Sequence, residues 1–408
     1  MKVGFKSCVV ALLVTVALTA CGQGSASSSA PIDIGAILPL TGDGSDFGPG
    51  MEAAARIAVD EVNAAGGPLG RKFTLHVEDD ATNPDQGVRA AHKLIDINHV
   101  SAIIGTWATA VTLAVFPLTV DAGILEMNVS GAPQVSTLQP PGQHTIFTVN
   151  ATDTDLSKIV AAALRKQSYS TVTIMANNDE ATSTFAKVFS DAFISDGGRI
   201  LKTVIYANNQ PSYNSEVAKA LTTKPDVFVL PCFTPDGALI LKEAFQAGSN
   251  GNWVVPAWCL NDQLVSAVGA NVVQGDTAFD LIPVSDSAAY KRLADAYQRN
   301  TGKDVFSNVY AAHVYDSIHL LALAIQKSGS LNGLQLGKAL IAVSNPPGAV
   351  VSSFSEGAAL LKQGKDVHYE GASGPIEFNQ TGDMSPYVGL FQMANGKAVL
   401  KVTLSQQS

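Results

Sequence analysis

The chain has 408 residues, of which 46% are apolar and 15% charged, so it is long enough for two domains and too hydrophobic to be disordered. Its formal net charge is −9, and it contains no basic run. This balance argues against a nucleic-acid-binding protein and against polybasic attachment to an anionic membrane.

The N-terminal segment has the pattern of a secretory leader. Two lysines precede an apolar run over Cys8–Ala20, which is too short to cross a bilayer as a helix. The run ends in the tetrapeptide Leu18–Cys21, which resembles the bacterial lipobox, whose cysteine becomes lipid-modified. We therefore expect 1–20 to be a lipoprotein signal peptide, Cys21 to be the lipidation site, and 21–30, rich in Ser, Gly and Ala, to be a flexible tether. An ordinary secretory leader with an accidental cysteine is the alternative.

The rest of the chain is expected to be extracytoplasmic, anchored to the cell membrane by the lipidated Cys21. It keeps two further cysteines, Cys232 and Cys259. Each follows an apolar run typical of a strand, so the two could lie on neighbouring strand ends and form a disulfide in an oxidising compartment. Two separate buried thiols are the alternative. The cysteine and histidine spacings indicate no metal site.

After Pro31, segments with strand periodicity alternate with segments of helical spacing. The helical signals include a Pro at the first turn after an Asn cap, at Asn83-Pro84, and a Gly66-Gly67 stop. The first series is expected to contain strand Ile32–Leu38, helix Met51–Ala65, strand Lys72–Glu78, a helix from Asn83 to about Ile97, strand Ala102–Ile104, helix Thr109–Thr119 and strand Ile124–Met127.

A second series follows the same alternation and ends in a tail of strands and tight turns. Its expected elements are helix Thr154–Gln167, strand Thr171–Ala176, helix Thr184–Asp196, strand Leu201–Ala207, helix Tyr213–Leu221, strand Val227–Leu230, helix Pro235–Ala247, strand Trp253–Val255, helices at about Ser287–Thr301 and Ser307–Ser328, and strands Pro375–Phe378, Tyr387–Met393 and Ala398–Leu404. Such alternation predicts parallel sheets with right-handed crossovers, in which ligands bind beyond the carboxyl ends of the strands.

A set of short motifs occurs in order along the chain. They are Ile34–Gly42, Asp60–Gly67 followed by Gly70-Arg71, Glu78-Asp79-Asp80 with Asn83-Pro84, Asp196-Gly197-Gly198, Tyr310–Ala312 with Tyr315-Asp316, and Gly374–Phe378 with Gly382-Asp383. This ordered set resembles the periplasmic branched-chain amino-acid binding protein family, the type I solute-binding proteins of ABC importers, in its lipoprotein form. The resemblance covers about residues 32–404, and although each motif is weak alone, the ordered set is specific.

The resemblance implies an α/β fold with two lobes, each a parallel sheet flanked by helices, joined by three interlobe crossovers. Lobe one is expected from residues 31–150 plus 280–366, and lobe two from 151–279 plus 367–408. The sequence without the resemblance indicates only an N-terminal and a C-terminal half. Residues 346–370 have the character of an insertion to which we assign no function.

The resemblance also implies a ligand site in the cleft between the lobes. The segment after the third strand opens a helix, and by its match to the family Thr106, Ala108 and Thr109 are expected to hold a ligand carboxylate, with the helix N-terminus supplying donors. Ser130 and Gly131, after the next strand, are expected at the same end of the ligand. Simple capping of the helix is the alternative for the first group.

An acidic residue and three aromatic residues complete the expected site. Asp236 matches the family position that pairs with a ligand ammonium, although an acid in a first helical turn is common in any helix. Phe47, Trp107 and Phe279 are expected to contact the ligand, with internal packing as the alternative for each.

One stretch departs from the family pattern. After strand Thr171–Ala176 the family often has a Tyr-Gly pair, whereas this chain has Ala181-Thr182, preceded by the polar run Asn178–Glu180. The pocket has therefore lost an aromatic wall or gained polar contacts, with Asp179 among them. Gly105–Trp107 is also similar to a Gly-x-Trp arrangement in amide- and urea-binding relatives, so the ligand stays open between amino acids, small amides and other carboxylates, aromatic acids included.

The motifs of the common enzyme classes are absent from the sequence. It contains no GxSxG, HExxH or GxGxxG, and Gly333–Lys338 is one residue short of a phosphate-binding loop. We expect a monomeric binding protein without a cofactor or bound metal, which takes an amino acid or related small polar ligand to the permease of an ABC importer. A ligand-sensing receptor domain is the alternative, and a lipid-anchored hydrolase is a remote one.

Overall fold

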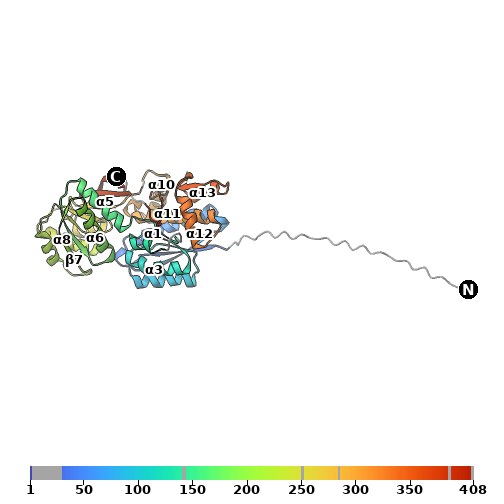
Figure 1. Ribbon diagram of the computed structural model, residues 1–408, viewed down its shortest axis with the longest axis horizontal. Helices are drawn as coiled ribbons and strands as arrows, with labels where there is room; N and C mark the ends of the chain where they lie inside the picture. Colours follow the sequence, from blue (N-terminus) through green and yellow to red (C-terminus); the bar gives the residue numbers. More distant parts are fainter. Residues whose placement is uncertain (2–29, 140–143, 250–251, 284, 385–386, 406–408) are drawn as a thin grey trace.

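The computed structural model describes residues 1, 30–139, 144–249, 252–283, 285–384 and 387–405. Cys21 lies outside the described residues, as do residues 2–20 of the expected signal peptide and 21–29 of the expected tether. The described chain forms two lobes, which lie side by side in Figure 1. Among the described residues, no helix has the length and hydropathy that crossing a membrane requires.

Lobe one is built on a sheet in which all neighbouring strands run parallel, in the order β2-β1-β3-β4-β5. The strands are β1 (Ile32–Leu38), β2 (Phe73–Asp79), β3 (Ala102–Ile104), β4 (Leu125–Asn128) and β5 (Ile146–Thr148). The helices are α1 (Gly48–Ala64), α2 (Pro84–His92), α3 (Thr109–Ala122), α4 (Pro133–Leu138), α10 (Ala288–Thr301), α11 (Val309–Ser328), α12 (Gly333–Ser344) and α13 (Phe354–Leu361), with short turns η1 (Gly42–Gly44), η2 (Pro68–Gly70), η3 (Lys93–Ile97) and η4 (Val305–Ser307).

Lobe two contains a seven-stranded sheet in the order β14-β13-β10-β9-β8-β6-β7. Its strands are β6 (Thr171–Asn177), β7 (Arg199–Tyr206), β8 (Val227–Val229), β9 (Trp253–Pro256), β10 (Thr277–Leu281), β13 (Tyr387–Ala394) and β14 (Lys397–Ser405), and its helices are α5 (Asp153–Lys166), α6 (Glu180–Ser195), α7 (Asn214–Leu221), α8 (Thr234–Gln246) and α9 (Asp262–Val268). The last two strands form an antiparallel hairpin, because Asn395 and Gly396 both adopt the positive φ that a two-residue turn requires.

The chain passes between the lobes three times, as the fold prediction required. It leaves lobe one after β5 and returns after β10, and Met384 packs in the core of lobe one whereas β13, from Tyr387, belongs to the sheet of lobe two. The third passage differs from the predicted boundary at 366/367. Val367, Tyr369 and Phe378 are buried in the core of lobe one, so the segment up to Met384 packs with that lobe.

Two further features of the C-terminal third differ from expectation. Residues 375–378, predicted to be a strand, make only isolated bridges, Glu370 with Pro375 and Phe378 with Met384. The apparent insertion 346–370 contains a two-stranded parallel sheet of β11 (Ala349–Val351) and β12 (Val367–Tyr369) together with α13, which packs on α11. It therefore extends the core of lobe one.

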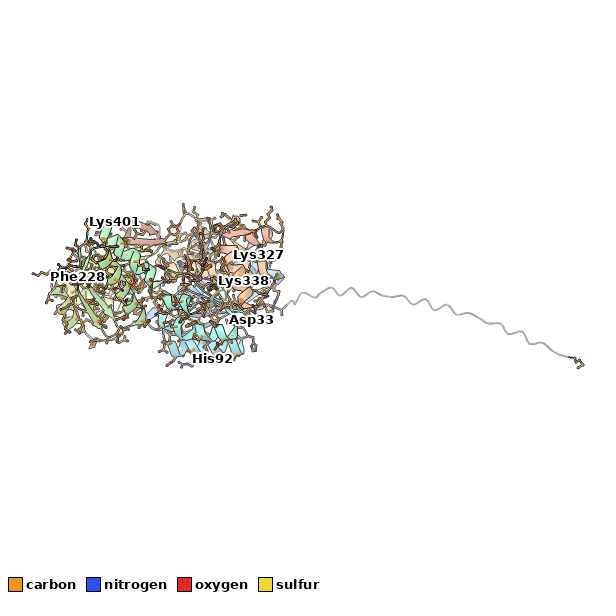
Figure 2. The ribbon with its side chains drawn as sticks, viewed as in Figure 1. Asp33, His92, Phe228, Lys327, Lys338 and Lys401 are labelled. Atoms are coloured by element: carbon orange, nitrogen blue, oxygen red, sulfur yellow. A yellow bond between two sulfur atoms is a disulfide. The ribbon has the colours of Figure 1, made fainter. Side chains whose placement is uncertain are left out.

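A disulfide between Cys232 and Cys259 joins the segment after β8 to the segment after β9 in lobe two. In Figure 2, Phe228 and Lys401 lie on this lobe, whereas Asp33, His92, Lys327 and Lys338 lie on lobe one. The disulfide packs against Gly237 of α8. A Cβ atom added to Gly237 would lie 2.2 Å from Cys259 Sγ and 2.7 Å from Cys232 Sγ. A residue larger than glycine at that position would collide with the disulfide.

Candidate ligand-binding site

A cavity of about 200 Å³ lies between the lobes and is lined by both of them. Much of its wall comes from residues that directly follow parallel strands. Trp107–Thr109 follow β3, Asp179 follows β6, Phe233 follows β8 and Trp258 follows β9. This placement agrees with the rule that open α/β sheets bind ligands at the carboxyl ends of their strands.

The wall from lobe one consists of the start of α3 and an aromatic pair. Ala108 is the N-terminal cap of α3 and offers no side-chain hydrogen bond, so the first amides of the helix keep free donors toward the cavity. Trp107 hydrogen-bonds the hydroxyl of Tyr310, and the centroids of their rings lie 5.8 Å apart in an edge-on arrangement. Burial, the first cause, and the nearby carboxylates of Asp280 and Asp153 raise the pKa of Tyr310.

Asp153, the first residue of α5, is a cavity residue that sequence reasoning missed. Its Oδ2 accepts a hydrogen bond from Thr109 Oγ1 at 3.2 Å. The ideal Cβ position of Gly131 lies only 2.0 Å from Asp153 Oδ1, so any larger residue at 131 would displace the carboxylate. Burial raises the pKa of Asp153 well above its usual range, and the neighbouring charges of Asp179 and Glu180 raise it further.

Asp280 in β10 is the second carboxylate that sequence reasoning missed. Its side chain is buried, and Oδ1 accepts a hydrogen bond from the amide of Leu281 at 2.7 Å. Burial raises its pKa to about 7. Asp179, which the sequence did single out, lines the same cavity and caps α6 by accepting a hydrogen bond from Ala181 N at 2.8 Å. Burial raises the pKa of Asp179 as well.

Four of the residues predicted to contact ligand lie behind the wall. The hydroxyl of Thr106 is buried and hydrogen-bonds that of Thr112, and Ser130 Oγ donates to Asn128 Oδ1 at 2.9 Å. Phe47 packs in the core of lobe one with its ring centroid 5.6 Å from that of Trp107, which it supports. Phe279 is fully buried in lobe two. The other predicted cavity residues of lobe one, Trp107, Ala108, Thr109 and Gly131, do line the cavity.

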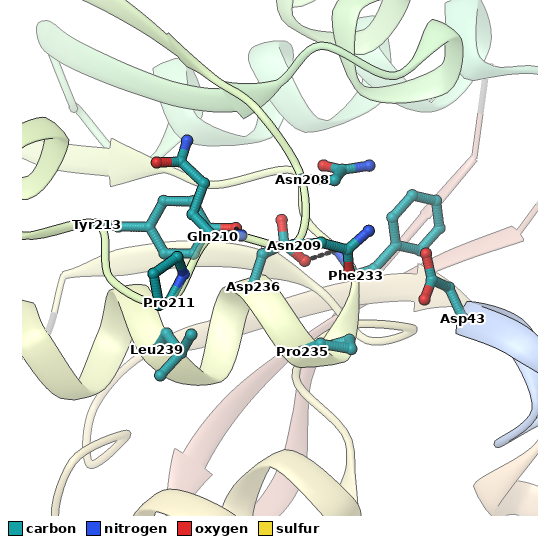
Figure 3. Close-up of a pocket in the computed structure, with 10 residues that line it drawn as sticks. All are labelled: Asp43, Asn208, Asn209, Gln210, Pro211, Tyr213, Phe233, Pro235, Asp236 and Leu239. Atoms are coloured by element: carbon teal, nitrogen blue, oxygen red, sulfur yellow. Dashed lines mark hydrogen bonds between the residues drawn. The ribbon is translucent and has the colours of Figure 1, made fainter.

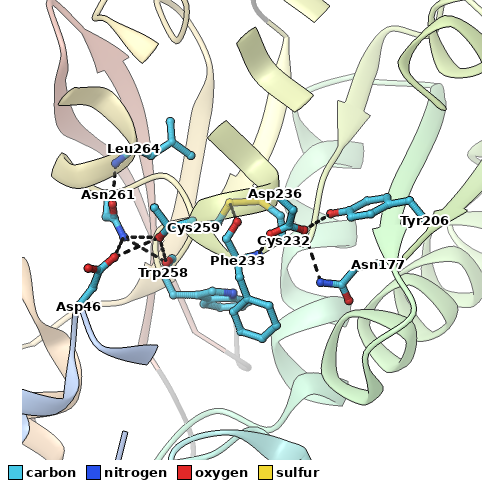
Figure 4. The surroundings of a disulfide bond; sticks show 11 residues. Asp46, Asn177, Tyr206, Cys232, Phe233, Asp236, Trp258, Cys259, Asn261 and Leu264 are labelled. Atoms are coloured by element: carbon cyan, nitrogen blue, oxygen red, sulfur yellow. Dashed lines mark hydrogen bonds between the residues drawn. A yellow bond between two sulfur atoms is a disulfide. The ribbon is translucent and has the colours of Figure 1, made fainter. Parts of the chain in front are cut away.

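Asp236 lies outside this cavity, in the wall of an adjoining one of about 320 Å³ (Figure 3). The two cavities share Asp43, Asn208 and Phe233 as lining residues. The carboxylate of Asp236 is buried and accepts hydrogen bonds from Phe233 N at 3.0 Å and from the hydroxyl of Tyr206, as Figure 4 shows. Burial raises its pKa to about 6, against the opposite effect of these hydrogen bonds. The bond from Phe233 N caps α8, whereas the bond from Tyr206 comes from the end of β7.

The sequence around each missed residue has an ordinary structural explanation that does not involve a ligand. Asp153 follows Thr152, whose side chain caps α5, so it has the pattern of an ordinary first-turn acid. Tyr310 belongs to one of the family motifs, and Trp258 is the neighbour of Cys259. Only the three-dimensional meeting of the lobes distinguishes these residues from structural ones.

Comparisons with known proteins agree with this architecture. The family model described as periplasmic binding protein matches residues 31–398. The Leu/Ile/Val-binding protein BraC3 of Rhizobium johnstonii is 26% identical over 379 residues, covering 91% of this chain and 94% of that protein. The solved structures include the leucine-binding protein LivK of Thermotoga maritima, with a TM-score of 0.79, 21% identity and coverage of 92% of this chain and 99% of that one.

The ligands of structurally similar proteins are diverse. A solute-binding protein of an ABC transporter from Rhodopseudomonas palustris, solved with 3,4-dihydroxybenzoic acid, has a TM-score of 0.74 at 20% identity, with coverage of 92% of this chain and 97% of that one. The shared fold therefore does not identify the solute. The match of the family model over nearly the whole described chain, together with the two-lobed fold, identifies this chain as a member of the periplasmic binding protein family.

Proposed function

We propose that this chain is an extracytoplasmic lipoprotein that captures an amino acid or a related small polar solute between its two lobes and delivers it to the permease of an ABC importer. The observation that carries the proposal is the cavity to which both lobes contribute lining residues. A solute bound there contacts both lobes at once, so it has a higher affinity for the closed arrangement than for an open one. Membership in a family of importer binding proteins supports the delivery step.

Direct hydrogen bonds across the cleft support a closing motion. Asp46 of lobe one accepts hydrogen bonds from Thr234 Oγ1 at 3.3 Å and from Asn261 Nδ2 at 3.2 Å in lobe two (Figure 4). A second contact joins Gln134 of lobe one to Glu180 of lobe two, with Gln134 Nε2 donating to Glu180 Oε1 at 2.8 Å. The three chain passages between the lobes supply the hinge about which such contacts form and break.

The test of solute capture is a thermal-shift screen followed by small-angle scattering. Purified protein is offered a panel of neutral, acidic and basic amino acids, amines, amides and aromatic acids. We expect one chemical class to raise the melting temperature and to reduce the radius of gyration, since a ligand bound only to the native state stabilises it. A panel in which no solute changes either quantity would contradict the proposed function.

The proposed anchor is tested separately in the native host membrane. Cys21→Ala removes the sulfur to which the lipid would attach, and we expect the variant to leave the membrane fraction while its solute binding stays unchanged. Retention of Cys21→Ala in the membrane fraction would contradict lipid attachment at this residue. Size-exclusion chromatography with light scattering tests the expected monomer.

A further inference from the structure

The charges around the interlobe cavity are of one sign. Four carboxylates line it, from Asp43, Asp153, Asp179 and Asp280. Among the described residues that line it, none is a lysine, an arginine or a histidine. An anionic solute such as an aromatic acid would have to approach these carboxylates with no cationic side chain to pair with.

Two of these carboxylates have an open hydrogen-bonding position although they are more than nine-tenths buried. Asp280 is 5% exposed, and its Oδ2 accepts no hydrogen bond from the described part of the chain, whereas Oδ1 accepts the amide of Leu281. Asp153 is 8% exposed, and of its two oxygens only Oδ2 is engaged, by Thr109 Oγ1, within the same described residues. Buried carboxylate oxygens almost always have donors, so these two acceptors are open to donors of a solute in the cavity.

The carboxylates of Asp153, Asp179 and Asp280 lie close enough to one another or to Tyr310 to interact electrostatically. The charges of Asp280 and Asp153 both raise the pKa of Tyr310, so both acids lie within electrostatic range of its hydroxyl. The charge of Asp179 in turn raises the pKa of Asp153. Without a counter-charge this crowding favours protonated acids, and a cation placed among them reverses that preference.

The remaining walls are aromatic and come from both lobes. Lobe one contributes Trp107 and Tyr310, and lobe two contributes Phe233 and Trp258. The ring centroids of Trp107 and Phe233 are 6.2 Å apart across the lobe boundary. Aromatic faces attract organic cations through the ring quadrupole, and they do so more strongly where water is excluded. Carboxylates and aromatic rings therefore favour the same kind of solute.

We propose that the solute of this cavity is an organic cation, a net-positive molecule whose charged nitrogen is held by Asp153 and Asp280 and enclosed by the four aromatic rings. This inference rests on the proposed function, because it names the chemical class that the solute-binding cavity takes. Primary amines, guanidinium groups and quaternary ammonium groups share this chemistry. The free amides at the start of α3 would accommodate the carboxylate of a basic amino acid and would be unused by a simple amine.

Isothermal titration calorimetry with three groups of probes tests the proposal. The cations are L-lysine, L-arginine, putrescine and choline, the neutral probe is L-leucine, and the anion is 3,4-dihydroxybenzoate. We expect at least one cation to bind, and the two other groups to bind at least about 100-fold more weakly. If L-lysine or L-arginine binds and putrescine does not, the solute is a basic amino acid. If putrescine binds and the two amino acids do not, the solute is an amine without a carboxylate.

The variant Asp280→Asn keeps the shape of the side chain and removes its charge, and we expect it to weaken cation binding on the order of 100-fold. Asp276→Asn is the matched control, because Asp276 is equally buried next to the same strand, burial raises its pKa to about 7, and it does not line the cavity. The control should bind the cation as the parent protein does. Equal loss in both variants would overturn the assignment of Asp280.

Choline provides a second readout, since its charge does not change with pH. The titratable groups that line the cavity together with Asp280 are Asp43, Asp153, Asp179 and Tyr310, and burial raises the pKa of the last three. Choline affinity should therefore rise from pH 5.5 to 8 as Asp280 ionises.

If L-leucine or 3,4-dihydroxybenzoate binds and every cation fails, the cation proposal is overturned while solute capture stands. If none of these probes binds, the cation proposal is overturned, and the wider thermal-shift panel decides whether solute capture stands.

Discussion

The two lobes contribute different chemistry to the same cavity. Lobe one presents the N-terminal end of α3, whose cap residue Ala108 makes no side-chain hydrogen bond, and the pair Trp107 and Tyr310. The elements of lobe two present the carboxylates of Asp153, Asp179 and Asp280, of which the first and the last are buried. Closing the lobes without a solute removes those carboxylates from water, which disfavours their charged form. A cation that enters with them offsets this cost, so the charge of the solute itself would favour the closed arrangement.

The lobes also differ in what holds them together. Lobe one surrounds the long helix α11, which is buried over most of its length, whereas lobe two fastens its cavity wall with the disulfide between Cys232 and Cys259. Phe233 and Trp258, the two aromatic residues that lobe two gives to the cavity, are the chain neighbours of those cysteines. The covalent bond therefore supports the binding wall directly.

The largest expected effect follows from this disulfide. The double variant Cys232→Ser with Cys259→Ser opens a loop with a sequence separation of 27, and we expect it to destabilise the protein by about 3–4 kcal/mol. Hydrogen exchange should become faster in β8 and β9 of lobe two and stay unchanged in β1 and β3 of lobe one. Reduction of the parent protein should reproduce the result. Equal loss of protection in both lobes would show that they unfold as one unit.

The second prediction concerns a buried acid of lobe one. Glu126 in β4 is fully buried, accepts a hydrogen bond from Thr119 Oγ1 at 2.6 Å, and has a pKa raised by burial to about 8. The folded chain therefore keeps a proton that the unfolded chain releases above pH 4.5. Stability should fall on the order of 3 kcal/mol as the pH rises from 5 to 8.

Glu126→Gln removes this titration and should flatten the pH dependence of urea unfolding, with higher stability than the parent at pH 8. Asp276→Asn makes the corresponding change in lobe two, where burial raises the pKa to about 7, so its effect should be smaller and complete at a lower pH. If the free energy of unfolding depends on pH in the same way in the parent protein and in Glu126→Gln, Glu126 is not protonated in the folded chain.

The sequence predicted most strands of the two main sheets, because strand and helix periodicity is local, but it missed β5 and β10. The match of the segment after the third strand to the family implied that Thr109 holds the ligand, and Trp107 of the same segment was expected to contact it; both residues line the cavity. The sequence-based predictions were wrong where a residue's place depends on which hydrophobic core it packs into. Phe47 and Phe279 are aromatic residues of the kind that line a ligand cleft. Their rings instead pack in the cores of lobe one and lobe two, respectively. Likewise, nothing near residue 367 marks that the chain stays with lobe one until Met384.

A third prediction addresses the contact between the lobes. Asp46→Ala removes the acceptor for Thr234 and Asn261, and its net hydrogen-bond contribution is about 1 kcal/mol. We expect solute affinity to fall roughly fivefold, with a larger radius of gyration at half saturation and an unchanged melting temperature without solute. Asp60→Ala, an exposed acid on α1 of the same lobe, is the control and should change none of these quantities. A normal affinity for Asp46→Ala would show that this contact does not stabilise closure.

The smallest effect on binding is expected at Asp236, and it decides between two positions for the solute. Asp236→Asn keeps the side-chain shape and weakens the cap of α8, so we expect a loss of stability of about 1 kcal/mol and less than a threefold change in solute affinity. The comparison is with Asp280→Asn in calorimetry under identical conditions. If the two variants lose affinity equally, the solute extends past Asn208 and Phe233 into the adjoining cavity, and the ammonium partner indicated by the sequence would be the correct one. If only Asp280→Asn loses affinity, Asp236 serves lobe two as a helix cap and the solute stays within the interlobe cavity.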